Sequence, residues 1–409
     1  MSDSPPATAK TLAPNRRMVW LLALASFAST STIRVLDPAL PQLAQEFDIT
    51  TGQAAKVVTV FAIAYGLMLF VFGPIGDRFG KYKTLSLATL ACSGGSLLVA
   101  LAPSFEWLLA ARIVSAITGA AIVPLAMAWI GDHIPYEQRQ TTLAQFTIGT
   151  ILGITSGQFI GGVFTDTVGW QGAFYFLAVV YLVVGSVLWS QRHLAQESVS
   201  NDSSGTNAKG WRAIVMPIVT VLRVRWARVV VVTVLLEGAL VFGVLSYIPT
   251  FLQEKHGMSS AAAGATAGLF AVGAFAYVFN ARWLIARLGE IPMVRLGGAI
   301  VCLCYVLYLF TPWWGWALLA SAATGLGYYF VHAVLQTRAT QMAPSLRGTA
   351  VSLSSSCLLL GQALGVSLGA IVVDRLGIDW LLGIAMVGFP VLILWFVFEA
   401  SRHKDQDNR

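Results

Sequence analysis

Twelve long apolar segments run through this sequence of 409 residues and leave few folds open to it. A helix needs about 20 residues to cross the roughly 30 Å hydrocarbon core of a bilayer, and each segment is of that order. Only helices and closed barrels satisfy the backbone inside lipid. We therefore predict an all-α polytopic membrane protein with membrane-spanning helices at 18–41, 54–76, 84–103, 107–130, 141–165, 172–190, 229–253, 261–288, 291–311, 314–337, 348–372 and 378–398.

The composition supports this prediction. Hydrophobic residues make up 56% of the chain and charged residues 11%, whereas a soluble domain carries about 25% charged residues. This balance excludes a disordered chain, a coiled coil and an ordinary soluble enzyme. The net charge of +7 comes from short loops between apolar segments, so we expect the lipid bilayer and no nucleic acid as a partner. All four cysteines lie inside apolar segments, which indicates neither a disulfide nor a metal site.

The basic residues predict the orientation. With both termini inside, 21 of the 26 Lys and Arg residues fall on the inner side, two in outer loops and three within spans. Inner loops of membrane proteins carry an excess of such residues. We therefore expect both termini to lie in the cytoplasm.

One long polar stretch, 191–228, separates the first six segments from the last six. It contains the low-complexity piece SVSNDSSGTNAKG, which is typical of a flexible linker. The predicted organisation is a cytoplasmic tail (1–17), a six-helix half (18–190), the linker (191–228), a second six-helix half (229–399) and a cytoplasmic tail (400–409).

The two halves resemble each other in sequence. Glycines recur every four residues in the fifth and the eleventh segment, which is typical of close helix packing. Three pairs of these glycines, one member in each segment, are offset by 208 residues, and so are Asp166 and Asp374. Related halves in a helical membrane protein indicate a transporter with its site between them. The helix-packing candidates are Gly153, Gly157 and Gly161, with Gly361, Gly365 and Gly369.

After the second segment comes the sequence Gly73-Pro-Ile-Gly-Asp77-Arg78-Phe-Gly80-Lys81. It resembles the signature loop of the major facilitator superfamily, and the resemblance extends over essentially the whole chain. It implies the major facilitator fold, with twelve helices in two pseudo-symmetric halves, and transport by alternating access. It also implies a bacterial inner-membrane protein, and we expect a monomer.

The signature residues form a candidate conformational gate. Asp77 is expected to face the start of the span 348–372 near Gly348, where a helix N-terminus favours negative charge. Arg78 or Lys81 is expected to pair with Asp132. The alternative is that these charges only set the topology. The gate candidates are Gly73, Asp77, Arg78, Gly80, Lys81 and Asp132.

Two further motifs are partial. Arg112 resembles the arginine motif of proton-coupled family members, although Ala116 stands where a glycine is usual. The sequence Gly157-Gln158-Phe-Ile-Gly161-Gly162 resembles the antiporter motif, with Gln158 in place of its proline. The glycine face is kept, but the bend that a proline imposes is lost.

Ionisable residues inside the apolar segments are the main functional candidates. A charge at the membrane centre costs about 2.5–3.5 kcal/mol on insertion scales, and such residues are usually functional. The deep ones are Arg34, Asp37, Lys56, Arg112, Glu237 and His332. The resemblance implies that the first, fourth, seventh and tenth spans line a central cavity, and five of the six fall there. We expect Lys56 to reach the interface rather than bind a ligand.

We expect an inner site of Glu237 with His332 and an outer cluster of Arg34, Asp37 and Arg112. Glu237 is the first candidate for proton coupling, because a carboxyl group among apolar neighbours takes up a proton more readily. It can instead be held by a permanent partner. His332 can titrate, bind substrate or only donate a hydrogen bond. Asp37 can carry a proton or only hold Arg34.

The substrate-binding candidates combine polar and aromatic residues, as ligand sites commonly do. An acid is common in drug antiporters of the resembled family where Arg34 stands here, so neutral, zwitterionic and anionic cargoes stay open. The candidates are Arg34, Arg112, Gln158, Tyr247, Tyr329 and His332, with further aromatic side chains from Phe61, Tyr65, Phe270 and Tyr328.

Two functions are compatible with these features. The first is proton-coupled efflux of a small amphipathic or drug-like molecule, driven by the proton gradient with no cofactor. The alternative is uptake or uniport of a small organic solute, such as an anion held by Arg34 and Arg112. No catalytic or nucleotide-binding motif supports an enzyme. A non-transporting receptor stays open.

Overall fold

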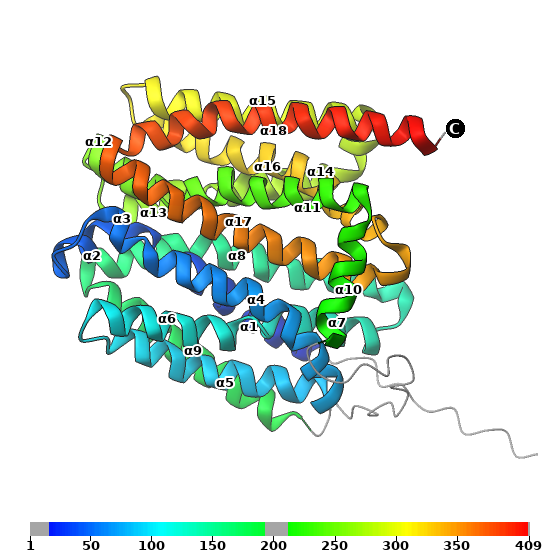
Figure 1. The fold of residues 1–409 in the computed structure, drawn as a ribbon. Helices are drawn as coiled ribbons and strands as arrows, with labels where there is room; N and C mark the ends of the chain where they lie inside the picture. The colour runs from blue at the N-terminus through cyan, green and yellow to red at the C-terminus, as the bar shows by residue number, and fades with distance from the viewer. Residues whose placement is uncertain (1–15, 193–211, 408–409) are drawn as a thin grey trace, which may run out of the picture.

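The computed structural model describes residues 16–192 and 212–407, which form a bundle of long helices (Figure 1). Within these residues there is no strand, and twelve helical stretches are long and apolar enough to cross a membrane. Each predicted segment corresponds to one of them, which confirms the all-α fold. The observed helices extend a few residues beyond most predicted segments, because their ends carry polar residues that hydropathy excludes.

The first half contains α1 (Arg16–Arg34), η1 (Asp37–Ala39), α2 (Leu40–Glu46), α3 (Thr51–Ala54), α4 (Lys56–Phe79), α5 (Lys81–Ala100), α6 (Phe105–Gly119), α7 (Ile122–His133), α8 (Tyr136–Thr167) and α9 (Trp170–Ser190). The second half contains α10 (Arg212–Arg223), α11 (Arg225–Glu237), η2 (Gly238–Gly243), α12 (Ile248–His256), α13 (Ser260–Gly268), α14 (Phe270–Leu288), α15 (Glu290–Phe310), α16 (Gly315–Gln341), η3 (Pro344–Leu346), α17 (Arg347–Leu376) and α18 (Ile378–Asp407).

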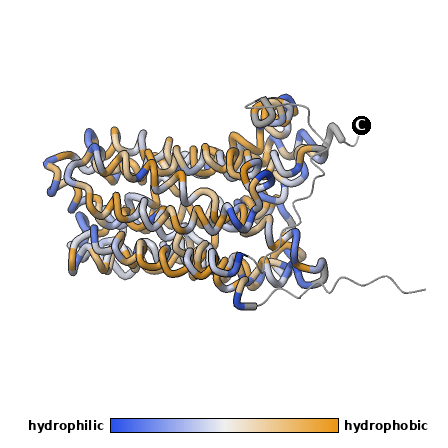
Figure 2. Tube along the Cα trace, turned by 90° about the horizontal axis from the view of Figure 1, so that it is seen from below, coloured by the Kyte–Doolittle hydropathy of each residue, from blue (hydrophilic) through white to orange (hydrophobic). Residues whose placement is uncertain are grey.

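The helices lie side by side, and hydropathy varies along their length. Figure 2 shows apolar residues along the middle of the bundle and hydrophilic residues gathered toward its two ends. Large apolar side chains are exposed around the bundle, for example Phe279 at 76% and Leu394 at 65%. Lipid tails solvate such side chains where water does not. The molecule is therefore a multi-pass membrane protein.

The two halves repeat one another. The spans that begin the halves start at Arg17 and Arg225, which are 208 residues apart. Gly169 and Gly377, also 208 apart, have φ angles of 88° and 96° and join α8 to α9 and α17 to α18. Residues with a side chain rarely adopt such positive φ angles, so glycine is favoured at both turns. The duplication inferred from sequence is therefore present in three dimensions.

Close helix contacts explain the regular glycines. A Cβ at Gly157 in α8 would overlap the backbone carbonyl oxygen of Ser31 in α1, and one at Gly161 would overlap that of Val35, just after α1 ends. Gly153 makes the same kind of contact with α1, while Gly361 and Gly365 in α17 approach the backbone of Leu235 and Ala239. Gly369 differs, because it faces the ring of Tyr247 and the side chain of Leu381.

The halves meet along two helix pairs, α8 with α13 and α4 with α17. In Figure 1, α17 lies next to α4 in this way, and α3 and α13 lie at the end of the bundle opposite α10. We call the end that carries α10 and the last turns of α18 the predicted cytoplasmic face, and the opposite end the predicted outer face.

The stretch predicted to be a linker is only partly a linker. Its last part forms helix α10, Arg212–Arg223, which packs against α11 and α17. Hydropathy alone missed this helix because its apolar residues follow helical spacing and lie between arginines. Residues 193–211, which include the whole low-complexity piece, lie outside the described residues, as do 1–15 and 408–409.

Candidate functional site

A buried acid–histidine pair lies in the second half of the molecule. Oε2 of Glu237, the last residue of α11, lies 3.0 Å from Nδ1 of His332 on α16. The Glu237 side chain is fully buried, and that of His332 is 18% exposed. Oε1 of Glu237 has no hydrogen-bond partner among the described residues. The structure thus brings together the two residues expected at the inner site.

Aromatic rings hold the histidine in place. The ring of Tyr328 stacks on His332 with centroids 4.9 Å apart and planes at 15°. Tyr329 packs edge-on against Tyr328 at 5.2 Å. On its other side Tyr328 packs against Phe242 at 4.9 Å and Phe270 at 5.6 Å. Since residues four apart share one helix face, Tyr328 and His332 form a single wall.

A second buried charged pair lies nearer the predicted outer face, where α1 ends. Nη1 of Arg34 lies 3.2 Å from Oδ2 of Asp37, and both side chains are at most 2% exposed. Gln158 on α8 donates from Nε2 to the same oxygen at 3.1 Å. Pro38 follows Asp37 and the chain changes from α1 to η1 here, which turns the carboxylate back toward the arginine. The expected ion pair therefore forms.

This pair also joins the two halves of the molecule. Nη1 of Arg34 donates to Oγ of Ser246 at 2.8 Å and to the carbonyl oxygen of Phe242 at 3.2 Å. Gln158 also contacts the carbonyl oxygen of Leu245 at 3.5 Å. Phe242 belongs to η2, a π-helical turn that begins just after Glu237. Such turns are rare and often occur at functional sites.

Arg112 does not join the charged pair by a hydrogen bond, contrary to expectation. It donates to the carbonyl oxygens of Thr32 at 3.1 Å and Val57 at 3.3 Å. Its guanidinium lies 4.0 Å from the ring centroid of Phe61. The side chain is fully buried, and backbone carbonyls are the nearest acceptors for a cation packed on a ring. Arg112 therefore ties α6 to α1 and α4.

Two tyrosines expected to bind substrate differ in position. Tyr247 is 1% exposed, and its hydroxyl donates to the carbonyl oxygen of Val366 at 2.9 Å. It serves the contact with α17, so it is unsuited to bind a ligand in this state. Tyr329 is partly exposed and packs on Tyr277 at 6.0 Å. Together with His332, it offers polar atoms and ring surface.

Sequence reasoning missed Ser246 and the carbonyl of Phe242 as partners of Arg34. One signal was available. Arg34 and Phe242 are 208 residues apart, the interval of the duplication. Equivalent positions of two halves approach each other only near the axis that relates them, so the residue at this interval from a buried charge is a candidate neighbour.

The gate candidates cluster at the predicted cytoplasmic face. Nζ of Lys81 lies 2.5 Å from Oδ2 of Asp132 and 3.4 Å from Oδ1 of Asp77. Arg78 packs over the ring of Phe79 at 5.2 Å. Gly80 lies between α4 and α5 with a φ of 91°, a backbone conformation that favours glycine. Lys81 is therefore the residue that pairs with Asp132.

The sequence led us to expect Asp77 to face the start of α17, and in this structure it does not. Its side chain is 70% exposed. A Cβ at Gly348 or at Gly73 would meet no described atom within 4 Å, apart from the chain neighbours and the backbone of the same helix. The halves are in contact at the outer face and around the Arg34 pair, which leaves these cytoplasmic ends apart.

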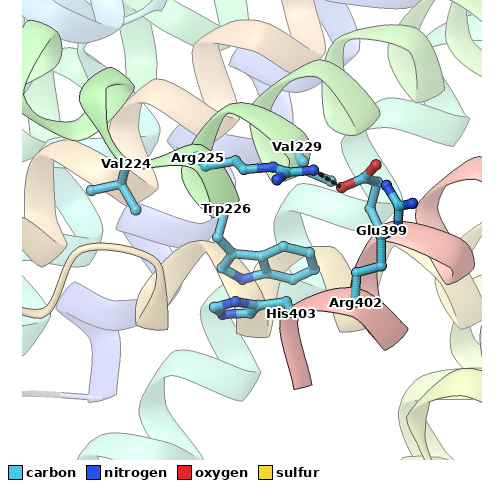
Figure 3. Close-up of a pocket in the computed structure, with 7 residues that line it drawn as sticks. All are labelled: Val224, Arg225, Trp226, Val229, Glu399, Arg402 and His403. Carbon is cyan, nitrogen blue, oxygen red and sulfur yellow. Dashed lines mark hydrogen bonds and ion pairs between the residues drawn. The ribbon is translucent and has the colours of Figure 1, made fainter. Parts of the chain in front are cut away.

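A separate pocket of about 180 Å³ lies at the predicted cytoplasmic face, between the start of α11 and the last turns of α18 (Figure 3). Trp226 stacks on His403 with centroids 4.6 Å apart, and Arg225 pairs with Glu399 at 3.2 Å. Trp226 and Glu237 are eleven residues apart on α11, or about 16 Å. This pocket is therefore distinct from the acid–histidine pair.

Comparison with known proteins gives one consistent result. The family model of the Major Facilitator Superfamily matches residues 22–357 and 281–409. The uncharacterized MFS-type transporter YwfA of Bacillus subtilis (strain 168) is 25% identical over 399 residues, covering 94% of this chain and 91% of YwfA. The multidrug export protein EmrB of Haemophilus influenzae is 24% identical over 168 residues, which is 41% of this chain and 33% of EmrB.

The fold is also similar to solved structures. A bacterial homolog of the human lysosomal transporter Spinster, in an inward-facing and occupied conformation, superimposes with a TM-score of 0.73. The two chains are 20% identical, and the match covers 95% of this chain and 97% of the other.

Proposed function

Because this chain belongs to the Major Facilitator Superfamily, we propose that it is a proton-coupled exporter of small amphipathic molecules that works by alternating access. One observation carries the proposal. Glu237, buried and with one carboxylate oxygen unpartnered among the described residues, touches a partly exposed histidine. The local similarity to a multidrug export protein supports an amphipathic cargo.

Glu237 is a better proton carrier than Asp37. Asp37 accepts hydrogen bonds from Arg34 and Gln158, and a cation at 3.2 Å favours the charged form of a carboxylate. The hydrogen-bond partner of Glu237 among the described residues is His332, and no arginine or lysine is bonded to it there. A buried carboxylate without a fixed cation is costly, so such a group takes up a proton more readily than one held by an arginine. Asp37 therefore acts as the structural partner of Arg34.

His332 supplies the route for the proton. Its ring is partly exposed, whereas Glu237 is fully buried. A proton that leaves Glu237 can pass to Nδ1, and the ring can release one from its other nitrogen. Because Nδ1 of His332 and Oε2 of Glu237 are 3.0 Å apart, a proton can pass directly between them. Substrate that displaces the proton from this pair would couple export to proton entry.

Direct contacts connect the proton site to the contact between the halves. Glu237 bonds His332, His332 stacks on Tyr328, and Tyr328 packs on Phe242. Arg34 lies 4.7 Å from the ring centroid of Phe242 and bonds its carbonyl oxygen. A change in the position of His332 can thus reach the residues that hold the two halves together.

The arginines offer little support for the alternative of an anionic substrate. Arg34 is neutralised by Asp37, and Arg112 donates to backbone carbonyls beneath Phe61. A ligand at the acid–histidine pair would instead meet an acid, an imidazole and the partly exposed ring of Tyr329. These groups suit a molecule with an apolar body and one polar or cationic group. With both termini in the cytoplasm, as the positive-inside rule predicts, the proposed export would carry such a molecule from the cytoplasm outward across the inner membrane.

The test uses everted inner-membrane vesicles with an imposed pH gradient, a fluorescent pH reporter and a panel of drugs, sugars and organic acids. For the wild type we expect some amphipathic compounds to collapse the gradient. For Glu237→Gln we expect no collapse, while counterflow of the same labelled compound continues because exchange needs no proton. Glu106→Gln is the matched control, since this exposed acid lies in the first turn of α6.

Two outcomes would overturn the proposal. Full substrate-dependent proton movement in Glu237→Gln would remove this carboxylate from the mechanism. Proton movement in the same direction as the solute would establish symport, the alternative stated from the sequence.

A further inference from the structure

Two carboxylates at the predicted outer face each bind the start of a helix in the opposite half. Asp166, near the end of α8, accepts hydrogen bonds from the backbone amides of Ser260 at 3.0 Å and Ala261 at 2.7 Å. Asp374, near the end of α17, accepts them from the amide of Gly52 at 2.9 Å and the hydroxyl of Thr50 at 2.7 Å. Both contacts therefore cross between the halves.

The two contacts are equivalent under the internal repeat. Asp166 and Asp374 are 208 residues apart, and so are Gly52 and Ser260, whose amides they bind. Each acid lies on the helix that packs closely within its own half, α8 on α1 and α17 on α11. The pseudo-symmetry thus places one such contact on each side of the molecule.

The backbone is shaped to let each acid approach. A Cβ on Gly52 would fall 2.5 Å from Oδ2 of Asp374 and 2.6 Å from the carbonyl oxygen of Ala370. On the other side, a Cβ on Gly162 would lie 2.8 Å from the Cα of Ala261. Each contact thus has a glycine where a larger residue would push the helices apart. Gly52 lies on α3, whose amide binds Asp374, whereas Gly162 lies on α8, which carries Asp166.

Helix starts are suitable partners for these acids. The first amide groups of a helix have no partner within the helix, and the aligned peptide dipoles give this end partial positive charge. A carboxylate that accepts two hydrogen bonds there satisfies these donors with charge-assisted bonds. When the halves separate at this face, water and ions must replace both interactions.

We propose that Asp166 and Asp374 form a two-sided latch that holds the outer face closed, so that both contacts must break each time this face opens. The latch sets the ratio of outer-closed to outer-open molecules. The inference rests on alternating access, which is part of the proposed function, but it needs neither proton coupling nor a particular substrate.

The experiment measures the distance across the outer face. Spin labels at Leu101 and Trp313, exposed residues next to α5 and α16 in the two halves, report separation by pulsed electron resonance, in a background with the native cysteines replaced by alanine. For Asp166→Ala and Asp374→Ala we expect the ratio of outer-open to outer-closed molecules to rise about two- to fivefold each. The double variant should show roughly the product, because the two sites are independent.

Asp379→Ala is the control, because this exposed acid lies in the first turn of α18 within its own half. Gly52→Ala tests the same contact from the other side. It keeps Asp374 and suits a helix, but should open the face as Asp374→Ala does. Unchanged distances in both aspartate variants, their double variant and Gly52→Ala would overturn the latch.

The latch and the proposed function fail separately. Distance shifts in the latch variants with no proton movement in any vesicle assay would keep the latch and reject the antiport. Proton-coupled export with unchanged distances in all latch variants would keep the antiport and reject the latch.

Discussion

Arg34 and Phe242 occupy equivalent positions in the two halves, and yet they touch. They are 208 residues apart, and Nη1 of Arg34 donates to the carbonyl oxygen of Phe242 at 3.2 Å. The guanidinium also lies 4.7 Å from the centroid of the phenylalanine ring. Residues related by a pseudo-twofold axis meet only near that axis, so the buried Arg34–Asp37 pair marks the centre about which the halves are arranged.

Removing Arg34 should destabilise the protein more than removing Asp37's charge. Arg34→Met leaves a fully buried carboxylate without its cation, and breaking one partner of a buried pair costs about 3–5 kcal/mol. Thermal unfolding in detergent should show a large drop in the midpoint. Arg34→Met combined with Asp37→Asn should recover part of it, because no charge is then left unpaired. A double variant no more stable than Arg34→Met would contradict this account.

Tyr328→Leu should uncouple proton movement from transport, whereas Tyr328→Phe should not. Leucine cannot stack on His332 or pack as a ring on Phe242, and phenylalanine can. We expect the leucine variant to fold, to exchange substrate in counterflow, and to show at least a severalfold weaker substrate-dependent pH response. Equal loss in both variants would point to the hydroxyl group instead of the stacked ring.

A methyl group at Gly161 should be far more harmful than one at Gly94. A Cβ at Gly161 would overlap the carbonyl oxygen of Val35, and overpacking of this kind costs about 1–3 kcal/mol. At Gly94 the added carbon would meet no described atom within 4 Å, apart from the chain neighbours and the backbone of the same helix. Gly94→Ala should be neutral or stabilising by up to about 1 kcal/mol, since alanine favours helix. Thermal unfolding of the two variants side by side checks the difference.

Asp77→Asn should slow turnover without weakening substrate affinity or stability. The side chain is 70% exposed and 3.4 Å from Lys81, and exposed ion pairs contribute only about 0–1 kcal/mol. Its role would lie in the state where the cytoplasmic ends approach. Initial rates of vesicle transport at varied substrate concentration separate the maximal rate from the half-saturating concentration. A raised half-saturating concentration with an unchanged maximal rate would contradict a gate.

Much of the fold was predictable because hydropathy is local. Each span needs about 20 apolar residues whatever its neighbours are, so the twelve spans follow from the sequence alone. The pairing of Glu237 with His332 also followed, since each is a rare polar residue in an apolar span. The gate pair was predictable only as a choice between Arg78 and Lys81, which depends on the turn at Gly80.

The rest depends on geometry that hydropathy does not contain. Arg112 was expected beside Asp37, but its length lets it reach the carbonyls of Thr32 and Val57 first. A tyrosine such as Tyr247 is a residue type common in ligand sites. Here, however, α17 lies so close that its hydroxyl bonds the carbonyl oxygen of Val366 instead. Gln158 looked like the loss of a proline, whereas the fold uses its amide to bond Asp37.

The close packing of α8 on α1 has a mechanical consequence. Because glycines of α8 pack directly against the backbone of α1, we expect these two helices to move together as one rigid unit. Gln158 and Asp166 both lie on this rigid unit, about 12 Å apart along α8. A tilt that lifts Gln158 from Leu245 therefore also lifts Asp166 from Ser260. The contacts at the centre of the molecule and those at its predicted outer face must therefore break in the same movement.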